Sequence, residues 1–170
     1  EGMSRVIWGK SVVTEVLHGL SFGISMASFF QTNPKSAERL YSEVLAFALE
    51  GVELRPNDVI MDLFCGTGTI GQLVAKHANA PVVGVDLVEQ AIEDAKEAAK
   101  NNGLSGVEFV AADAGKFLLE HPEYQGKIHT VILDPPRAGI SPKTLRKVMR
   151  LEAQRLVYVS CNPATQARDL

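Results

Sequence analysis

Residues 59–71 read VIMDLFCGTGTIG, and this stretch decides the fold. Its first half is apolar except for Asp62, as expected of a central parallel strand that is covered on both faces. Gly66, Gly68 and Gly71 follow in the pattern G-x-G-x-x-G, which permits a tight turn and lets a ligand lie against backbone amides at the start of a helix. The pattern alone also fits an ordinary strand-to-helix turn, so the neighbouring sequence is needed to distinguish a ligand-binding turn from an ordinary one.

Three acids at the ends of later apolar runs strengthen the ligand-binding interpretation. The run at residues 82–85 ends at Asp86, about 20 residues after the first glycine, where a doubly wound fold places the carboxylate that accepts hydrogen bonds from ribose hydroxyls. Two further runs end at Asp113 and Asp134. Strands that alternate with helices form a parallel sheet, so these acids should meet at its carboxyl edge, where ligands bind. Each acid could alternatively cap a helix.

The other predicted elements extend this α/β pattern. A hairpin is predicted from residues 12–17 and 20–25, and a helix from Lys35 to Glu50 with Asn33 as its cap and Pro34 at its first position. Further elements are predicted, in chain order, at residues 82–86, 88–101, 107–112, 130–133 and 156–160. We assign residues 1–30 to the end of a preceding β-rich lobe and residues 31–170 to the main domain.

The composition limits the classes of protein to which the chain can belong. The 170 residues, 46% hydrophobic and 22% charged, fit one globular domain. No membrane span of roughly 20 apolar residues and no secretion signal is found, so a cytoplasmic protein without membrane contact is expected. The two cysteines support neither a disulfide framework nor a metal cluster. Since the net charge is −3, any RNA affinity must be local or must come from other segments.

Four motifs in a fixed order resemble one family. They read FFQTN at 29–33, DLFCGTG at 62–68, DPPRAG at 134–139, and YVSCNPAT at 158–165 with RDL at 168–170. Over roughly residues 20–170 the chain thus closely resembles the RNA uracil-5-methyltransferases, which make 5-methyluridine in tRNA or ribosomal RNA with S-adenosylmethionine as methyl donor. The resemblance implies a Rossmann-like class I methyltransferase fold with a mostly parallel, doubly wound sheet. Such a sheet has two more strands, so we expect a domain that is truncated at its C-terminus and preceded by a short β-hairpin.

The resemblance makes Cys161 the catalytic nucleophile. C5 of uracil is too poor a carbon nucleophile to attack a methyl sulfonium, so a thiolate must first add to C6. Cys161 stands at a strand end before Asn162-Pro163 and a predicted helix, whose positive end would favour the thiolate. An isolated cysteine is more simply a small buried hydrophobe, and Cys65 in the glycine turn is given that role.

The resemblance also implies a cofactor site and no metal. Its residues would be Gln31, Phe64, Gly66, Gly68, Thr69, Asp86, Asp113 and Asp134. Asp86 would bind the ribose hydroxyls, Asp113 would face the adenine end, and Phe64 would pack near the methionine part. Thr69 and Asp113 stand where asparagine can occur in the family, and both keep the ability to form hydrogen bonds.

Asp134 and Arg137 are predicted to lie on the side of the target base and the RNA. Arg137 replaces the aromatic residue that methyltransferases of amino nitrogens carry after Asp-Pro-Pro, which argues against an exocyclic amine as acceptor. Arg137 could contact RNA phosphate, hold a carboxylate or form a structural ion pair. In the family, the base that removes the C5 proton is a glutamate past the position of Leu170, so residues 1–170 alone are expected to turn over poorly.

Alternative functions stay open at this point. A cytosine-5 RNA methyltransferase needs the same thiolate addition, but such families usually carry a second cysteine in the motif that reads DPPR here. A module that binds cofactor or RNA without catalysis fits the acidic net charge, and a small-molecule methyltransferase is a more distant possibility. The sequence does not indicate which RNA or which uridine is modified.

Overall fold

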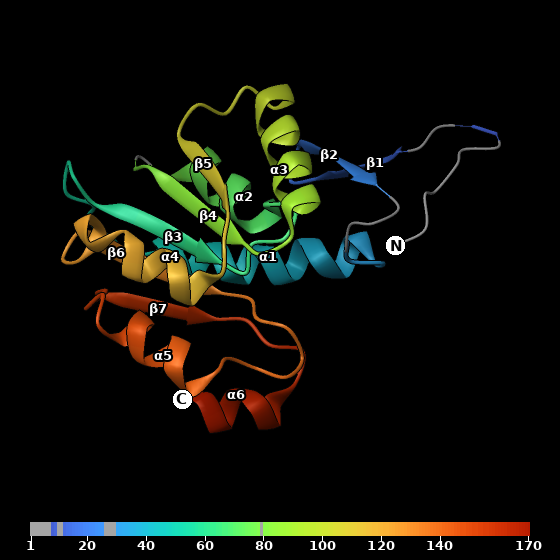
Figure 1. The fold of residues 1–170 in the computed structure, drawn as a ribbon. Helices are drawn as coiled ribbons and strands as arrows, with labels where there is room; N and C mark the ends of the chain where they lie inside the picture. Colours follow the sequence, from blue (N-terminus) through green and yellow to red (C-terminus); the bar gives the residue numbers. More distant parts are fainter. Residues whose placement is uncertain (1–7, 10–11, 26–29, 79) are drawn as a thin grey trace.

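The computed structural model describes residues 8–9, 12–25, 30–78 and 80–170, and its centre is a five-stranded parallel sheet. The strands are β3 Val59–Leu63, β4 Val82–Asp86, β5 Val107–Ala111, β6 Ile128–Leu133 and β7 Arg155–Tyr158. They lie in the order β5-β4-β3-β6-β7 (Figure 1). The chain runs from β3 outward to β4 and β5, then returns to β6 on the other side of β3, so the strand order reverses between β3 and β6. Ligands of doubly wound folds bind at the carboxyl ends of strands beside such a reversal.

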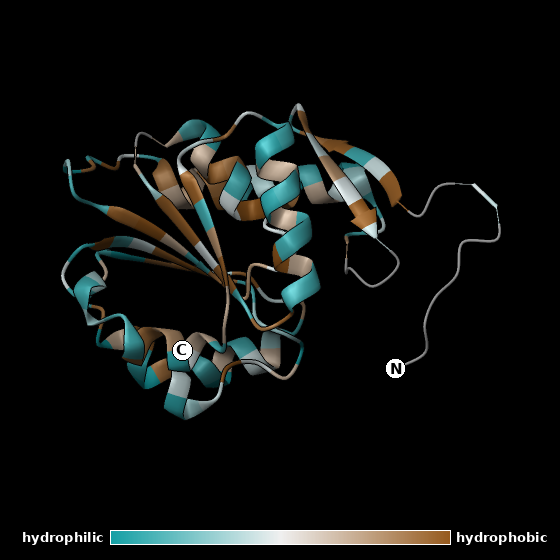
Figure 2. Cartoon of the chain, turned by 45° about the horizontal axis from the view of Figure 1, so that its top comes forward, coloured by the Kyte–Doolittle hydropathy of each residue, from teal (hydrophilic) through white to brown (hydrophobic). Residues whose placement is uncertain are grey.

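Helices cover both faces of the sheet. They are α1 Pro34–Leu49, α2 Thr69–His77, α3 Glu89–Asn101, α4 Ala114–Glu120, α5 Pro142–Met149 and α6 Pro163–Asp169, with a 3-10 turn at Pro122–Tyr124. Ile60 and Ile132 pack with α1 and α2 in one core, whereas Met61 and Val131 pack with α4 and α5 in a second core. Figure 2 shows the apolar strands between helices whose outer faces are hydrophilic. The fold is therefore the predicted Rossmann-like α/β fold.

The predicted hairpin precedes this domain with the predicted bounds. It consists of β1 Val12–Leu17 and β2 Leu20–Ser25. The Asn102 side chain ties it to the end of α3, because its Oδ1 accepts from the Ser21 amide at 2.9 Å and its Nδ2 donates to the Ser21 carbonyl at 3.0 Å. Three hairpin side chains are buried in the core shared with α1 and α2: Leu17, Leu20 and Phe22. The hairpin thus packs onto the main domain, and the assignment of residues 1–30 to a preceding lobe stays a prediction.

Helix α1 begins as the sequence predicts. The Asn33 side chain accepts from the Ser36 amide at 3.2 Å, and Pro34 is the first helical residue. The helix ends just before Gly51, which takes a positive φ of 66°. Of the first predicted motif, Phe29 lies outside the described residues.

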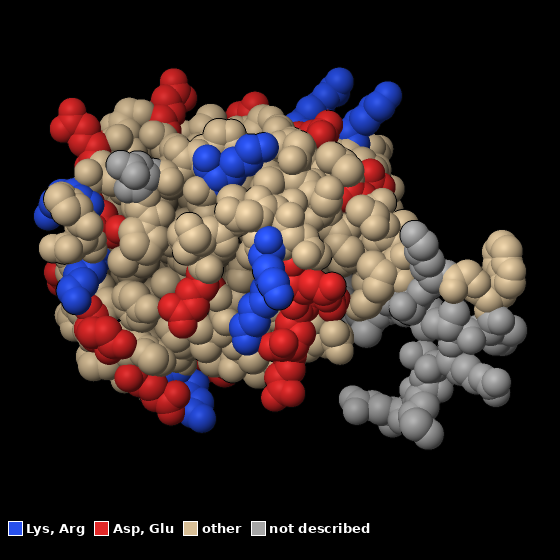
Figure 3. Space-filling view, turned by 90° about the horizontal axis from the view of Figure 1, so that it is seen from above, with Lys and Arg blue, Asp and Glu red and all other residues tan. Residues whose placement is uncertain are grey.

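The described surface carries charges of both signs. On the face shown in Figure 3, Lys and Arg side chains are interspersed with Asp and Glu and form no large patch of one sign. No described helix has the length and apolar character that crossing a bilayer requires. Within the described ranges, no three His, Cys, Asp or Glu side chains come together as a candidate metal site.

Candidate active site

The glycine turn after β3 has a strained backbone. The amides of Phe64 and Cys65 both donate to the Val85 carbonyl, at 2.8 and 3.2 Å. Phe64 has a positive φ of 65°, which is rare for a bulky residue and recurs at functional sites. Gly66 and Gly68 follow with φ of 54° and 71°, values that glycine adopts without strain. The predicted tight turn is present, and it begins at Phe64, two residues before the first glycine.

The N-terminus of α2 opens onto this turn. Its N-cap residue is Gly68, which has no side chain that could accept hydrogen bonds from the first amides of the helix. Thr69, the first helical residue, is buried, and its hydroxyl lies 3.5 Å from that of Thr67. Because helix N-termini carry partial positive charge, this end of α2 suits an anionic ligand group.

Asp86 links the glycine turn to the start of α3 through two hydrogen bonds. Its Oδ2 accepts from the Gly66 amide at 2.9 Å, and its Oδ1 accepts from the Val88 amide at 2.9 Å. The residue is half-buried. Each carboxylate oxygen has two lone pairs, so both oxygens can still accept a hydrogen bond from a ligand. The capping and ligand-binding roles considered for Asp86 are therefore compatible.

Asp113 and Gln31 come from two further segments. Asp113 is exposed and caps α4, with its Oδ1 accepting from the Lys116 amide at 2.8 Å. It follows β5, whose Ala111 pairs in register with Asp86 of β4, so both acids lie at the carboxyl edge. Gln31 is half-exposed in the loop before α1. The structure shows the capping role of Asp113, and its role toward a ligand stays a prediction.

Asp62 is a buried carboxylate without a hydrogen bond. Its side chain is fully buried on β3, and neither oxygen has a partner among the described residues. A Cβ at Gly71 would come within 3.0 Å of its Oδ2, so the third glycine leaves room for this carboxylate. Burial and, second, Asp134 raise the pKa of Asp62 to about 8, and the Gly71 amide opposes the rise only in part. Sequence reasoning gave Asp62 no role, although an acid inside an apolar strand is a visible signal.

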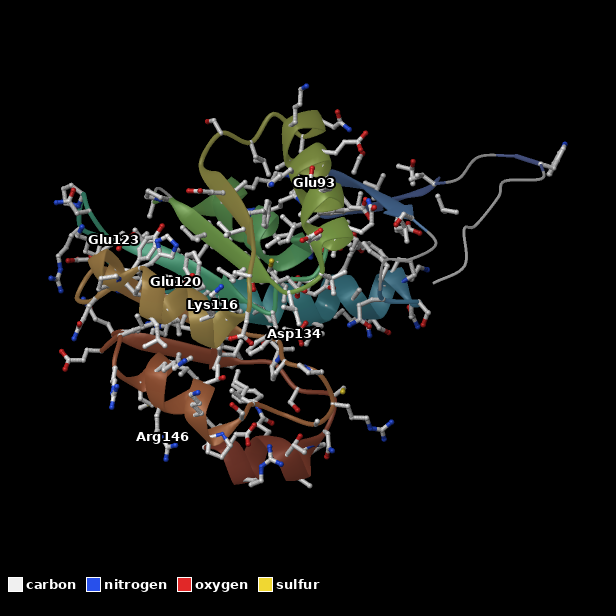
Figure 4. All side chains as sticks on the ribbon, viewed as in Figure 1. Glu93, Lys116, Glu120, Glu123, Asp134 and Arg146 are labelled. Atoms are coloured by element: carbon white, nitrogen blue, oxygen red, sulfur yellow. The ribbon has the colours of Figure 1, made fainter. Side chains whose placement is uncertain are left out.

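Asp134 and Tyr41 complete an acidic cluster with Asp62. Asp134 follows β6 across the strand-order reversal, and its amide donates to the Leu63 carbonyl at 3.3 Å. Burial raises the pKa of Asp134 to about 6, and Figure 4 shows this residue inside the molecule. Tyr41 on α1 is 6% exposed, and burial, followed by Asp134 and Asp62, raises its pKa well above the ordinary value. Two neighbouring acids that resist ionising together favour a bound cation. The sequence patterns assign Tyr41 to no site.

Cys161 is exposed in the loop between β7 and α6. The Ser160 hydroxyl donates to the Asn162 carbonyl and accepts from the Asn162 amide, both at 3.0 Å, which closes a tight turn at the thiol. Two side chains of the same segment, the Thr165 hydroxyl and the Asn162 amide, donate to the Arg137 carbonyl at 3.4 and 3.5 Å. The structure therefore brings together the loops of Cys161 and Arg137, two of the predicted site residues.

Cys65 has the opposite environment. Burial, followed by Asp62 and Asp86, raises the pKa of its thiol well above the ordinary value. A neutral thiol is a poor nucleophile. The structure thus supports the packing role that the sequence predicts for Cys65.

A cavity of about 460 Å³ lies away from these residues. It is lined by Ala46, Phe47, Glu50, Arg155, Leu156, Val157 and Tyr158. The lining comes from the end of α1 and from β7, and none of the predicted site residues contributes to it. We place the active site at the carboxyl edge of the sheet because the strained turn, the acidic cluster and the exposed thiol follow strand ends there.

This arrangement combines an α/β fold, a strand-order reversal of the kind at which small ligands bind, and an exposed thiol in the loop after β7. The methyltransferase domain family matches residues 54–169, so the chain belongs to that family. An uncharacterized RNA methyltransferase from Clostridium acetobutylicum is 49% identical over 164 residues, 96% of this chain and 34% of the relative. Another from Caldanaerobacter subterraneus is 47% identical over 166 residues, 98% of this chain and 35% of the relative.

A solved structure gives the same similarity in three dimensions. The tRNA (uracil-54, C5)-methyltransferase from Pyrococcus abyssi, in complex with S-adenosyl-L-homocysteine, matches with a TM-score of 0.81 and 34% identity over 99% of this chain and 41% of that chain. These relatives confirm the resemblance to RNA methyltransferases that the four motifs indicate. The chain spans about a third of the length of the curated relatives that it matches.

Proposed function

We propose that this protein methylates C5 of a uridine in RNA, with S-adenosylmethionine as methyl donor and Cys161 as covalent nucleophile. The observation that supports the proposal is the exposed Cys161, whose loop is hydrogen-bonded to the Arg137 carbonyl in a chain of the methyltransferase domain family. The cytoplasmic location predicted from the sequence belongs to the same proposal. Because the P. abyssi relative acts on uracil-54 of tRNA, tRNA is the first RNA to test.

The residues at the carboxyl edge fit S-adenosylmethionine. This cofactor carries an ammonium and a sulfonium against one carboxylate. Its cationic groups would favour the ionised forms of Asp62 and Asp134, and its carboxylate suits the helix end that no side chain caps. Asp62 and Asp134 would lie nearest its cationic groups, and Asp86 would accept from the ribose hydroxyls. When bound there, the cofactor supplies an electrophilic methyl group. Phe64, Gln31 and Asp113 keep the predicted roles around it.

Cys161 would supply the electrons that uracil C5 lacks. Its thiolate forms a bond to C6, and the C5–C6 π electrons move onto C5 and O4 as an enolate. The enolate carbon C5 would then take the methyl group from the sulfonium sulfur, and the pair of the broken C–S bond would stay on sulfur as S-adenosylhomocysteine leaves. A base must next remove the C5 proton, after which the C6–S bond breaks and the thiolate leaves. We assign that base to no residue of this chain, in keeping with the predicted glutamate past Leu170.

Asp134 supports uracil over cytosine as the target base. Its pKa of about 6 leaves the carboxylate mostly ionised at neutral pH, and an ionised carboxylate can only accept hydrogen bonds. Uracil offers an N–H donor at N3, where cytosine has an acceptor. A carboxylate facing N3 would therefore reject cytosine, because two buried acceptors would face each other. Arg137, exposed on the same loop, would contact an RNA phosphate.

Trapping on 5-fluorouridine RNA tests the proposal. Fluorine at C5 cannot leave as a proton does, so the adduct between thiol and base persists on a denaturing gel. With the full-length protein, S-adenosylmethionine and 5-fluorouridine-substituted tRNA or ribosomal RNA fragments, we expect an adduct that Cys161→Ala abolishes and Cys65→Ala retains. A protein that binds the cofactor but gives no adduct with either RNA would refute uracil C5 chemistry and favour the non-catalytic module.

A further inference from the structure

The buried carboxylate of Asp169 joins three segments around the Cys161 loop. Its Oδ2 accepts from the Ile140 amide at 2.7 Å and from the Tyr158 hydroxyl at 2.7 Å. Its Oδ1 accepts from Nε and Nη2 of Arg168, at 2.8 and 2.6 Å. The side chain is 3% exposed. Asp169 therefore links the loop after β6, the end of β7 and its own helix α6 through one group.

The loop after β6 is fitted closely to this carboxylate. Gly139 has a φ of 79°, and a Cβ at this position would collide with the Asp169 carboxylate and the Arg168 guanidinium. The same guanidinium donates from Nη2 to the Ala138 carbonyl at 3.0 Å. Residues 138–140 thus lie directly on Asp169, and no larger residue than glycine fits at the point of contact.

The bonds to Asp169 are the strong links between the two loops. Hydrogen bonds to an ionised carboxylate are shorter and about twice as strong as neutral ones. The Ile140 amide first, and then the Tyr158 hydroxyl, lower the pKa of Asp169 to about 2, so it is ionised at neutral pH. The direct bonds from Thr165 and Asn162 to the Arg137 carbonyl are longer, at 3.4 and 3.5 Å.

The linked segments carry the two halves of the proposed chemistry. Asp134 and Arg137 precede Ile140 on the loop after β6. Cys161 lies between Tyr158 and α6. Their relative placement therefore depends on a residue that touches neither the base nor the thiol.

We propose that Asp169 is a positioning residue, which holds the Cys161 loop at a fixed distance from the Asp134–Arg137 loop. The inference rests on the proposed function, because it assigns the base to one loop and the attacking thiol to the other. Thiol addition needs the sulfur near C6 and aligned with the ring face, and a misplacement of about 1 Å can cost on the order of 100-fold in rate. The carboxylate sets this alignment without taking part in bond making.

Asp169→Asn in the full-length protein tests the inference. Asparagine keeps the shape but loses the charge and presents a donor to Arg168. At saturating 5-fluorouridine RNA and S-adenosylmethionine, we expect single-turnover adduct formation to slow roughly 10- to 100-fold. The affinity for S-adenosylmethionine and the alkylation rate of Cys161 by iodoacetamide should stay within about twofold of the wild-type values. Slower adduct formation with an unchanged alkylation rate would separate the placement of the thiol from its reactivity.

Asp58→Asn is the matched control. Asp58 is also a buried aspartate, 5% exposed, whose Oδ2 accepts from a backbone amide, that of Arg55, at 2.8 Å. It precedes β3, at the amino edge of the sheet, away from the Cys161 loop. This variant should lose stability without slowing adduct formation. Equal slowing by both variants, or an Asp169→Asn rate within twofold of wild type, would overturn the positioning role.

Hydrogen exchange keeps the test independent of the proposed function. The Ile140 amide should exchange faster in Asp169→Asn than in the wild type and Asp58→Asn, and unchanged exchange would overturn the inference even if no RNA adduct forms. If Asp169→Asn does not fold, Tyr158→Phe removes one bond and keeps the carboxylate. That variant should slow adduct formation several-fold, and an unchanged rate would again contradict the positioning role.

Discussion

Two regions of the carboxyl edge each contain one buried carboxylate and one cysteine, in opposite environments. In the β3 region, the Asp62 oxygens have no hydrogen-bond partner among the described residues and the pKa of Asp62 is raised to about 8, while burial keeps the Cys65 thiol neutral. In the α6 region, Asp169 accepts four hydrogen bonds and has a pKa lowered to about 2, and Cys161 is exposed.

The difference separates binding from positioning. A buried polar group normally finds partners in its own protein, so a carboxylate that finds none is suited to a ligand. A carboxylate that accepts hydrogen bonds from three segments already has its partners, and it determines where those segments lie. We infer that the β3 region is prepared for the cofactor and the α6 region for the attack on the base.

The largest expected difference lies between the two thiols. Thiolate fraction and exposure control alkylation, so iodoacetamide at neutral pH should modify Cys161 more than about 100-fold faster than Cys65. Peptide mapping by mass spectrometry after timed quenching gives both rates in one sample. Comparable rates would show that the β3 region is open to reagents and that the environments of Cys65 and Cys161 do not differ as described.

Removing the Asp62 carboxyl group should weaken cofactor binding. Asp62 is protonated in the free protein near neutral pH, and a bound cation would favour its ionised form, so Asp62→Asn removes a carboxylate that would form on binding. A loss of roughly 1.5 kcal/mol corresponds to about a tenfold weaker Kd for S-adenosylmethionine. Isothermal titration calorimetry measures it. Asp169→Asn serves as the control from the other region and should leave the Kd within twofold. The account fails here if the two variants behave alike.

The third contrast concerns stability without ligand. The folded protein holds the Asp62 proton up to about pH 8, whereas the unfolded chain releases it near the ordinary value of 3.8. The free energy of unfolding should therefore fall as pH rises between these values. Asp62→Asn should remove this fall and gain roughly 1–3 kcal/mol near pH 8.

Asp169 should show the opposite pH dependence. Its folded pKa is depressed to about 2, so its contribution is present above about pH 4 and is lost as pH falls toward 2. Urea unfolding at a series of pH values measures both effects. An Asp62→Asn profile that follows the wild-type profile from pH 4 to 8 would contradict the environment described for Asp62.

Much of the fold could be predicted because its signals are local. The hairpin bounds, the Asn33 cap and the strand at residues 59–63 depend on neighbours in sequence. Two helices were not named in advance. The seven-residue α4 is too short to show periodicity, whereas α5 has a Ser141 cap and Pro142 at its first position, a signal that could have been used.

The site was predictable only where a motif marks it. The glycine turn, Asp86 and Cys161 stand in recognisable patterns, and their placement at one sheet edge agrees with those patterns. Asp62 and Asp169 gain their character from long-range packing. Nothing adjacent in the sequence shows that the first lacks partners or that the second bonds Ile140 on another loop.

Locating the covalent bond tests the central claim most directly. Wild-type protein would be trapped on 5-fluorouridine RNA with methyl-labelled S-adenosylmethionine, digested with nuclease and protease, and sequenced by tandem mass spectrometry. The account predicts one modified peptide, in which Cys161 carries a fluorouridine nucleotide with the labelled methyl group. A nucleotide on another residue, or on Cys161 without the labelled methyl, would contradict methylation of uracil C5 through this thiol.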